Sequence, residues 1–366
     1  MSFSNKSGEG SILFFQKQLA EEQALTSATA ERLYDLSAAL AALKPWGFVG
    51  DSNLMLVQTS PPTETCYCSI MGALGEVFSL HIYVGEESFR GLSRVLAGEQ
   101  PSPGEFFASH RGVSVEFIKA SALTPPDREL LKHFKHPFGR GMAAPIFRAL
   151  RPGYYPWYVT EPEAAVLARC MQAVVAFCET LLDDPDAPYW EEEDLYPVLA
   201  LEGADGPRQK FAVRQIKAPA PTPALPVPPI LDEARLGRIL RQDHAVGGAL
   251  EVDYFYSNAR IGGKNRRQSL LPVALVTDAA SGFLFQPELG SPEQSRGESL
   301  VRAVLAAIEN ARYLPHELRV RQKEFKILLE PAAQRLGVPV RLVKSLPALD
   351  EAKKHLLAML EGRAGK

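Results

Sequence analysis

Residues 218–229 read APAPTPALPVPP, and this stretch decides how the chain is divided. Six of its twelve residues are prolines, and it contains neither a charged residue nor a glycine. Because proline fixes φ and lacks a backbone N–H, such a segment favours an extended, semi-rigid spacer. We therefore predict a Pro-rich linker at 218–229, between an N-terminal domain at 1–217 and a C-terminal domain at 230–366. A structured loop wrapped around the N-terminal domain is the alternative.

The composition on both sides of the linker is that of folded protein. The 366 residues suit two domains, and contents of 46% hydrophobic and 23% charged residues predict packed cores. We find no uninterrupted apolar run near the length of a membrane helix, so no membrane partner is expected. Four cysteines are too few for a disulfide framework, which favours reduced thiols and a cytoplasmic location.

Charge is distributed unevenly between the two sides. The formal net charge of −3 divides into −8 for residues 1–217 and +5 for residues 230–366, and the linker contributes none. Opposite signs allow the domains to dock on each other, or the basic one to meet a polyanion. Two ordinary solvated surfaces are the simpler interpretation.

The N-terminal domain is predicted to be α+β with an antiparallel sheet. Helical periodicity over 11–43 ends at Pro45, and a period of two follows. The best helix is 161–182, with Thr160 as N-cap and acidic residues in its first turn. Strands are expected at 53–58, 65–72, 77–84, 113–120, 146–150, 154–159, 195–202 and 210–217, with shorter helices at 88–96 and 125–134.

The C-terminal domain is predicted to be α/β with a mixed sheet. After a helix at 232–242, the pattern gives three antiparallel strands, then helix, strand, helix, strand, helix. The expected strands are 250–261, 268–278, 282–289, 317–320 and 339–342. The expected helices after the third strand are 297–310, 325–336 and 349–360.

This order resembles the ribonuclease-H-like core of integrases and transposases. ALEVDYFY (249–256) places Asp253 in the middle of the first strand, as the first catalytic acid is placed in those cores. LLPVALVTDAASGFLF (270–285) is similar to their second and third strands, and LLEPAAQRLGVPVRLV (328–343) to a helix and fifth strand. The resemblance covers residues 249–360 and implies a ribonuclease-H-like fold.

The same resemblance implies carboxylates that converge on two Mg²⁺ ions. Asp253 meets the first position, but the end of the fourth strand reads Arg319-Val320-Arg321-Gln322-Lys323 where a second acid is required. Asp350 or Glu351 on the last helix are the candidates for a third. Since cations repel a metal ion, we predict a non-enzymatic binding or adaptor protein without a cofactor. A Mg²⁺-dependent nuclease that uses Asp253 with Asp350 or Glu351 is the alternative.

The most basic loop, RIGGKNRR (260–267), is predicted to be a hairpin tip. Lys264, Arg266 and Arg267 could contact phosphate groups, with Arg319, Arg321 and Lys323 on the same edge. A solvated hairpin tip is the alternative. The partner is thus either a protein or a nucleic acid that meets the basic C-terminal domain.

Two further patterns lie in the N-terminal part. Trp46-Gly47 and Tyr67-Cys68-Ser69-Ile70-Met71-Gly72 resemble a pattern of bacterial two-domain proteins whose function is unknown. Cys66 and Cys68 are two residues apart on an expected strand and so share one face. Their spacing does not suit a zinc knuckle, and we expect buried free thiols.

Overall fold

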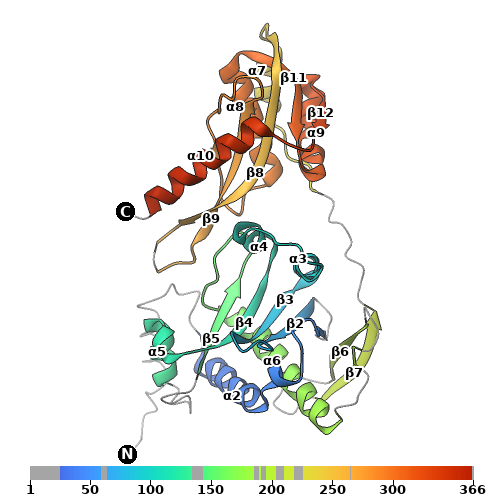
Figure 1. The fold of residues 1–366 in the computed structure, drawn as a ribbon, viewed down its shortest axis with the longest axis vertical. Helices are drawn as coiled ribbons and strands as arrows, with labels where there is room; N and C mark the ends of the chain where they lie inside the picture. The colour runs from blue at the N-terminus through green and yellow to red at the C-terminus, as the bar shows by residue number, and fades with distance from the viewer. Residues whose placement is uncertain are drawn as a thin grey trace, which may run out of the picture. The chain divides into compact units, whose positions relative to one another are not determined.

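The computed structural model describes residues 25–58, 64–133, 143–184, 189–190, 195–202, 210–217, 226–263 and 265–364. The chain forms two compact units, which are described separately (Figure 1). The first comprises Met1–Gln100, Ser109–Thr222 and Gly263–Arg267, and the second comprises Pro101–Ala108, Pro223–Gly262 and Gln268–Lys366. Of the linker predicted at 218–229, residues 218–225 lie outside the described residues.

The first unit is built on a seven-stranded sheet with the order β5-β4-β3-β2-β1-β6-β7. Neighbouring strands are antiparallel except β1 and β6, which are parallel. This arrangement agrees with the α+β class predicted from the sequence. The strands are β1 (Met55–Gln58), β2 (Thr65–Met71), β3 (Phe78–Val84), β4 (Gly112–Ile118), β5 (Ala144–Leu150), β6 (Leu195–Glu202) and β7 (Lys210–Lys217).

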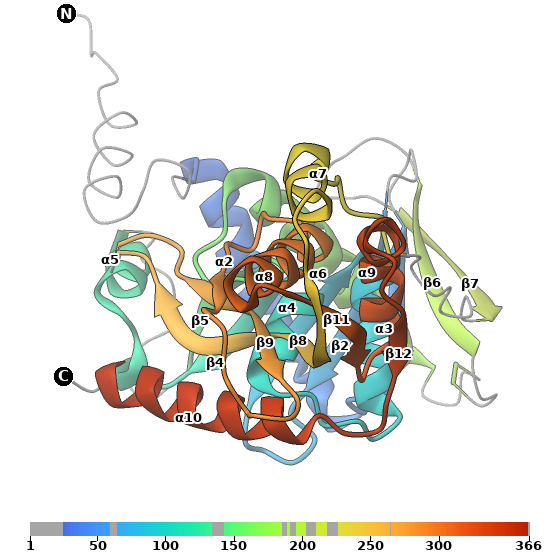
Figure 2. The same ribbon diagram turned by 90° about the horizontal axis from the view of Figure 1, so that it is seen from above.

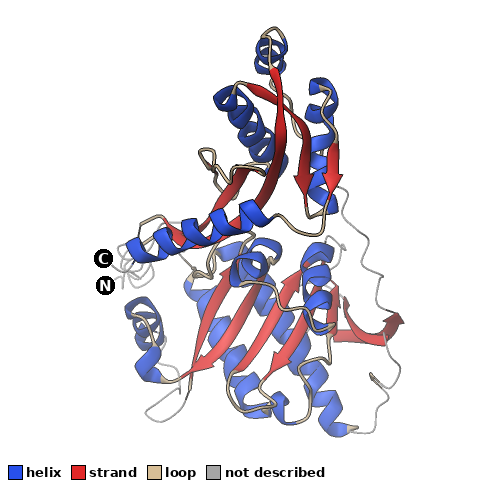
Figure 3. Ribbon diagram, turned by 45° about the horizontal axis from the view of Figure 1, so that its top comes forward, coloured by secondary structure: helices blue, strands red, loops and turns tan. Residues whose placement is uncertain are grey.

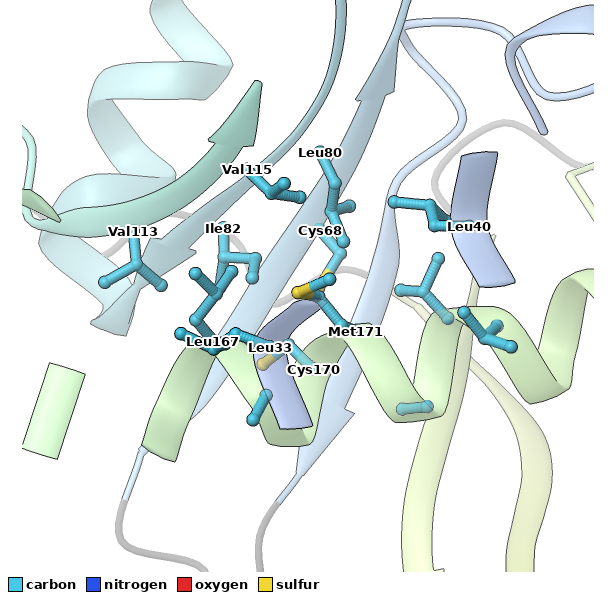
Figure 4. Packing of buried hydrophobic residues seen from close by; sticks show 14 of the residues in the cluster. Leu33, Leu40, Cys68, Leu80, Ile82, Val113, Val115, Leu167, Cys170 and Met171 are labelled. Carbon is cyan, nitrogen blue, oxygen red and sulfur yellow. The ribbon is translucent and has the colours of Figure 1, made fainter. Parts of the chain in front are cut away.

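Helices α2 (Ser27–Leu43) and α6 (Glu161–Asp183) pack on one face of this sheet (Figure 4). Alternation along the strands directs Cys68, Leu80 and Val115 toward them, and every one of these side chains is fully buried. α6 begins as predicted, with Thr160 N donating to the Glu163 carboxylate at 2.8 Å. By length and composition alone α6 could cross a membrane, but its apolar character is explained by burial in this core.

Short helices complete the first unit. α3 (Gly85–Leu96) packs on the opposite face of the sheet, where the rings of Phe89 and Tyr67 stack 4.2 Å apart. The chain also forms α5 (Pro125–His133), η2 (Pro45–Gly47) and η3 (Ala120–Ala122).

The Trp-Gly and Tyr-Cys-Ser-x-Met-Gly patterns meet in this unit and have a packing role. The Trp46 ring lies against Phe78 and Phe117, with centroids 4.8 and 5.6 Å away. Gly72 has a φ of 141°, and a Cβ there would lie 2.9 Å from the Trp46 Cβ. The close approach of Trp46 therefore requires glycine at position 72.

The second unit has a five-stranded mixed sheet with the order β10-β9-β8-β11-β12. β9 is antiparallel to β8 and to β10, whereas β11 is parallel to β8 and to β12. The predicted succession of strands and helices is thus present. The strands are β8 (Ala245–Ile261), β9 (Ser269–Asp278), β10 (Glu288–Leu289), β11 (Tyr313–Val320) and β12 (Val340–Leu342).

Helices cover both faces of the second sheet (Figures 2 and 3). α8 (Arg296–Ala311) and α9 (Lys323–Leu336), with α7 (Glu233–Leu240), bury the side of Leu250, Val252 and Tyr254. α10 (Pro347–Ala364) packs on the other side, against Phe255 and the β9 residues that face the same way. The alternation of β8 therefore sends Glu251, Asp253 and Phe255 toward α10.

One expected strand is absent, a second is much shorter than expected, and one helix was not predicted. The strand expected at 282–289 is reduced to β10 (Glu288–Leu289), with an isolated bridge between Leu284 and Thr277. Residues 154–159 form no strand; Tyr154 and Trp157 make isolated bridges, and that of Trp157 is with Ala149. Pro156 has no N–H to contribute to a ladder, which explains why pairing stops. In addition, α4 (Pro103–Ser109) was not predicted, because its sequence PGEFFAS begins with proline and glycine.

Candidate functional site

The candidate site is a cluster of charged side chains between the second sheet and α10. Asp253 lies in the middle of β8 and is 3% exposed, so its carboxylate requires partners that replace water. Arg321 directly follows β11, the strand next to β8. The side chains of both residues reach the space beneath the first turns of α10.

Arg321 joins two carboxylates. Its Nη2 donates to Asp253 Oδ2 at 3.0 Å, and its Nη1 lies 2.7 Å from Asp350 Oδ1 in the first turn of α10. Burial by itself would lower the pKa of Arg321, but the Asp253 and Asp350 carboxylates raise it above its ordinary value. The guanidinium therefore stays charged and bridges the two acids.

A second cation shares the same oxygen of Asp253. Lys353 Nζ lies 3.5 Å from Asp253 Oδ2 and 4.1 Å from the centroid of the Phe255 ring. A cation in this position is attracted by both the carboxylate and the face of the ring. Asp253 Oδ2 thus has one cation from the end of β11 and one from α10.

Glu251 is the neighbouring acid on the same face of β8, and it is 1% exposed. Its Oε2 accepts the backbone N–H of Leu349 at 2.8 Å, which satisfies one of the free donors at the start of α10. Burial raises the pKa of Glu251, and this effect exceeds the opposing effect of the helix N–H groups and Arg319. Across the strand pair, Thr277 is fully buried, and its Oγ1 has no hydrogen-bond partner among the described residues.

Glu317 on β11 is held in a separate ion-pair group. Arg319 Nε donates to its Oε1 at 2.7 Å, and Arg341 Nε lies 2.5 Å from its Oε2. The hydrogen bond from Arg319 is the main reason that the pKa of Glu317 is lowered. Both oxygens of this carboxylate are therefore engaged by arginine.

The structure brings together some of the predicted acids and separates others. Asp253 and Asp350 meet on one guanidinium, whereas Glu351 points elsewhere and pairs with the exposed His355 at 2.9 Å. Within the described part of the chain, no group of three or more His, Cys, Asp or Glu side chains is placed to hold a metal ion. The cluster can neutralise and orient charges, and it presents no set of carboxylates that is free of cations.

Sequence reasoning did not single out Glu251 or Lys353. Glu251 stands two residues before Asp253, so strand alternation alone places it on the same face. Lys353 stands three residues after Asp350, which puts it on the same side of a helix. Both spacings can be seen in the sequence. They indicate a shared cluster only when it is known that α10 covers this face of β8.

The predicted phosphate-binding residues have different surroundings. Arg267, which belongs to the first unit, has a side chain only 5% exposed and donates to the carbonyls of Ala149 and Tyr158. Arg319 and Arg321 are engaged by the acids described above. Arg266 and Lys323 are exposed, and Lys264 lies outside the described residues.

The four cysteines are free and buried, as expected. Cys66 and Cys68 share the face of β2 that meets Cys170 on α6, and thiol contacts join Cys170 to both. The hydrogen bond with Cys170 and burial raise the pKa of Cys66, and burial raises that of Cys178 to about 12. The thiols of Cys66 and Cys178 are therefore protonated, and all four cysteines are shielded from solvent, as in a structural core.

The matches to known families fall on either side of the predicted linker. Residues 31–196 match the family model of a domain of unknown function (DUF7309), and residues 235–357 match that of a second domain of unknown function (DUF6930). No curated protein matches the chain, and no solved structure matches it. The chain therefore combines two domain types to which no function is assigned.

Proposed function

We propose that this chain is a non-enzymatic binding or adaptor protein. We further propose that its C-terminal unit is a ribonuclease-H-like domain in which protein cations stand where the related enzymes hold metal ions. The observation that carries this proposal is the Arg321 bridge between Asp253 and Asp350.

The order of elements supports the fold part of the proposal. Three strands joined antiparallel are followed by α8, β11, α9, β12 and α10, which is the order implied by the resemblance to integrase and transposase cores. Asp253 lies in the first of these strands, Arg321 follows the fourth, and Asp350 lies in the first turn of the last helix. These are the three places where that resemblance implies acids.

The charges support the non-enzymatic part. Two-metal catalysis requires carboxylates that hold two cations about 4 Å apart and leave open positions for substrate oxygens. Here Asp253 Oδ2 is already shared by Arg321 and Lys353. Neither cation can supply an activated water or accept a phosphoryl oxygen as a metal ion does, so the nuclease alternative would require both to leave.

A metal-binding experiment tests the proposal. We expect no binding of Mn²⁺ by the wild-type chain, measured by electron paramagnetic resonance, and no Mg²⁺- or Mn²⁺-dependent cleavage of DNA, RNA or a hybrid duplex. The variant Arg321→Asp adds an acid between Asp253 and Asp350, and we expect it to bind Mn²⁺ and to be stabilised by it on thermal unfolding. Metal-dependent cleavage by the wild type that is lost in Asp253→Asn would overturn the proposal.

A double variant provides the control. The double variant Arg321→Asp with Asp253→Asn keeps the aspartate introduced at position 321 but lacks the carboxylate of Asp253. Its binding of Mn²⁺ and its stabilisation by Mn²⁺ should therefore be lost. If both variants respond equally, the added aspartate binds metal without Asp253, and the cluster is not a former metal site.

The location and source are also proposals. Buried free thiols support a reducing compartment, and we infer a cytoplasmic protein. We infer a bacterial source from the Trp46–Gly72 pattern alone. Whether a tagged chain fractionates with soluble cytoplasmic proteins after gentle lysis tests the location.

A further inference from the structure

The two faces of the second sheet are covered in different ways. On the side of α8 and α9, 25 described apolar residues form one buried cluster. On the side of α10, the buried cluster has six described residues: Leu346 just before the helix, Leu349 in its first turn, and Phe255, Leu271, Val273 and Leu275 from the sheet. Since apolar burial is the main stabilising term, α10 has much less to hold it than α8 and α9 do.

The polar contacts of α10 with the sheet lie in its first two turns. They are the Leu349 N–H on Glu251, the Asp350 carboxylate on Arg321, and the Lys353 ammonium near Asp253. In the third turn Leu356 and Leu357 are half-buried against the same apolar cluster, and Met359 after them is 59% exposed. The fully buried and the polar attachments of the helix are thus concentrated at its start.

Packing of α10 on the sheet buries polar groups at a cost in free energy, and detachment of the helix would remove this cost. Glu251 and Asp253 are almost fully buried beneath α10, and charged groups that lose water are poorly repaid even when paired. The buried hydroxyl of Thr277 has no hydrogen-bond partner among the described residues, which is a further penalty. Water would reach all three groups once α10 moved away.

We propose that α10 is a strap that detaches as one unit while the rest of the second unit stays folded. The bridge from Arg321 to Asp350 is its latch, and the exposed residues Lys344 and Ser345, between β12 and α10, are its hinge. Opening exposes the β8 and β9 residues Phe255, Leu271, Val273 and Leu275, together with the charged cluster. This inference stands whether or not the domain is related to ribonuclease H, because it rests on the contacts of α10 alone.

Hydrogen–deuterium exchange of the full chain, followed by mass spectrometry, tests the strap. In the wild type we expect the amides of α10 to exchange at least about tenfold faster than those of α8, because local opening needs less free energy than global unfolding. Asp350→Asn removes the latch and should speed exchange in α10 by about threefold to tenfold, with α8 unchanged.

The adjacent residue supplies a matched control. Glu351→Gln removes an exposed carboxylate from the same helix turn, and its partner is His355 rather than the sheet. We expect this variant to exchange like the wild type. Equal protection of α10 and α8 in the wild type would overturn the proposal, and so would a parallel rise in both helices in Asp350→Asn. Equal effects of the two variants would show that Arg321 is not the latch.

Discussion

A guanidinium and a magnesium ion satisfy the same carboxylates in different ways. A metal ion gathers oxygens from all directions and keeps positions for water, whereas arginine donates in one plane from a fixed fork. Arg321 uses this fork to reach Asp253 and Asp350 together. The residue therefore holds α10 against the sheet and at the same time removes the open coordination that metal chemistry needs.

The sequence allowed part of this cluster to be predicted. The end of the fourth strand could be located from its residue pattern. Its basic residues at 319–323 could therefore be recognised as unsuited to binding a metal ion. The choice between Asp350 and Glu351 could not be made, since the rotation of α10 about its axis depends on packing of Leu346 and Leu349. The burial of Arg267 could not be predicted either, because it depends on contacts with Ala149 and Tyr158, which are distant in sequence.

Gly247 at the start of β8 leads to a prediction about stability. A Cβ on Gly247 would lie 1.9 Å from Cδ2 of Tyr313, whose hydroxyl donates to Asp278 Oδ2 at 2.5 Å. Gly247→Ala should lower the free energy of unfolding of the second unit by about 1–3 kcal/mol, because the ring must move and give up that bond. Urea unfolding followed by far-UV circular dichroism measures the change.

The neighbouring glycine is the control. A Cβ on Gly248 would lie 3.4 Å from Asp278 Oδ2, an ordinary contact, so Gly248→Ala should change stability by less than about 0.5 kcal/mol. Tryptophan fluorescence is unsuited to this measurement, since all three tryptophans, Trp46, Trp157 and Trp190, precede the linker. Equal losses in the two variants would show that the Tyr313 ring is not the cause.

At the scale of elements, strands that are buried on one or both faces were the most predictable. β9 and α6 have long, regular patterns, and their observed bounds lie within one residue of the expected ones, whereas β8 begins five residues earlier than expected. Errors fell where proline interrupts a pattern, as at Pro156, or where a helix has few good helix formers, as in α4. Pairing of β1 with β6 could not be predicted, because it joins residues about 140 positions apart in parallel register.

The start of α10 leads to a prediction about pH. Burial raises the pKa of Glu251 in the folded state, so the folded chain holds its proton up to a higher pH than the unfolded chain does. Stability of the second unit should therefore fall as pH rises from the unfolded pKa, about 4.5, through the raised folded pKa. Glu251→Gln is neutral at every pH and keeps an oxygen for the Leu349 N–H, so this fall should be absent.

Urea unfolding at a series of pH values between 4.5 and 8 compares the two proteins. The difference between Glu251→Gln and the wild type should grow in favour of the variant as pH rises. A deficit of the variant that grows as pH rises would show that the charge of Glu251 is needed to cap α10 and that burial does not dominate.

At the scale of the whole molecule, each unit has its own sheet and its own buried core. The units are not continuous in sequence, since Pro101–Ala108 belongs to the second and Gly263–Arg267 to the first. Composition and the linker predicted two α+β domains, and they could not predict these short exchanged segments. Expression of either side of the linker alone would therefore omit a part of the unit it is meant to contain.

The cations predicted to contact phosphate groups lead to a prediction about nucleic-acid binding. Of the six cations that could meet phosphate, Arg267, Arg319 and Arg321 are occupied by protein oxygens. Among the described residues this leaves Arg266 and Lys323, and Lys264, which lies outside them, is counted as a third contact. Each phosphate contact contributes about −0.9 to the slope of log K against log salt concentration on duplex DNA, so three contacts limit the slope to about −3. We expect the full chain to bind a short duplex weakly, with a slope no steeper than about −3. Fluorescence anisotropy at salt concentrations between about 50 and 200 mM, over which such binding changes strongly, measures the slope. Arg266→Glu with Lys323→Glu should abolish what binding there is, and a slope steeper than about −5 would show that the occupied arginines leave their carboxylates to bind phosphate.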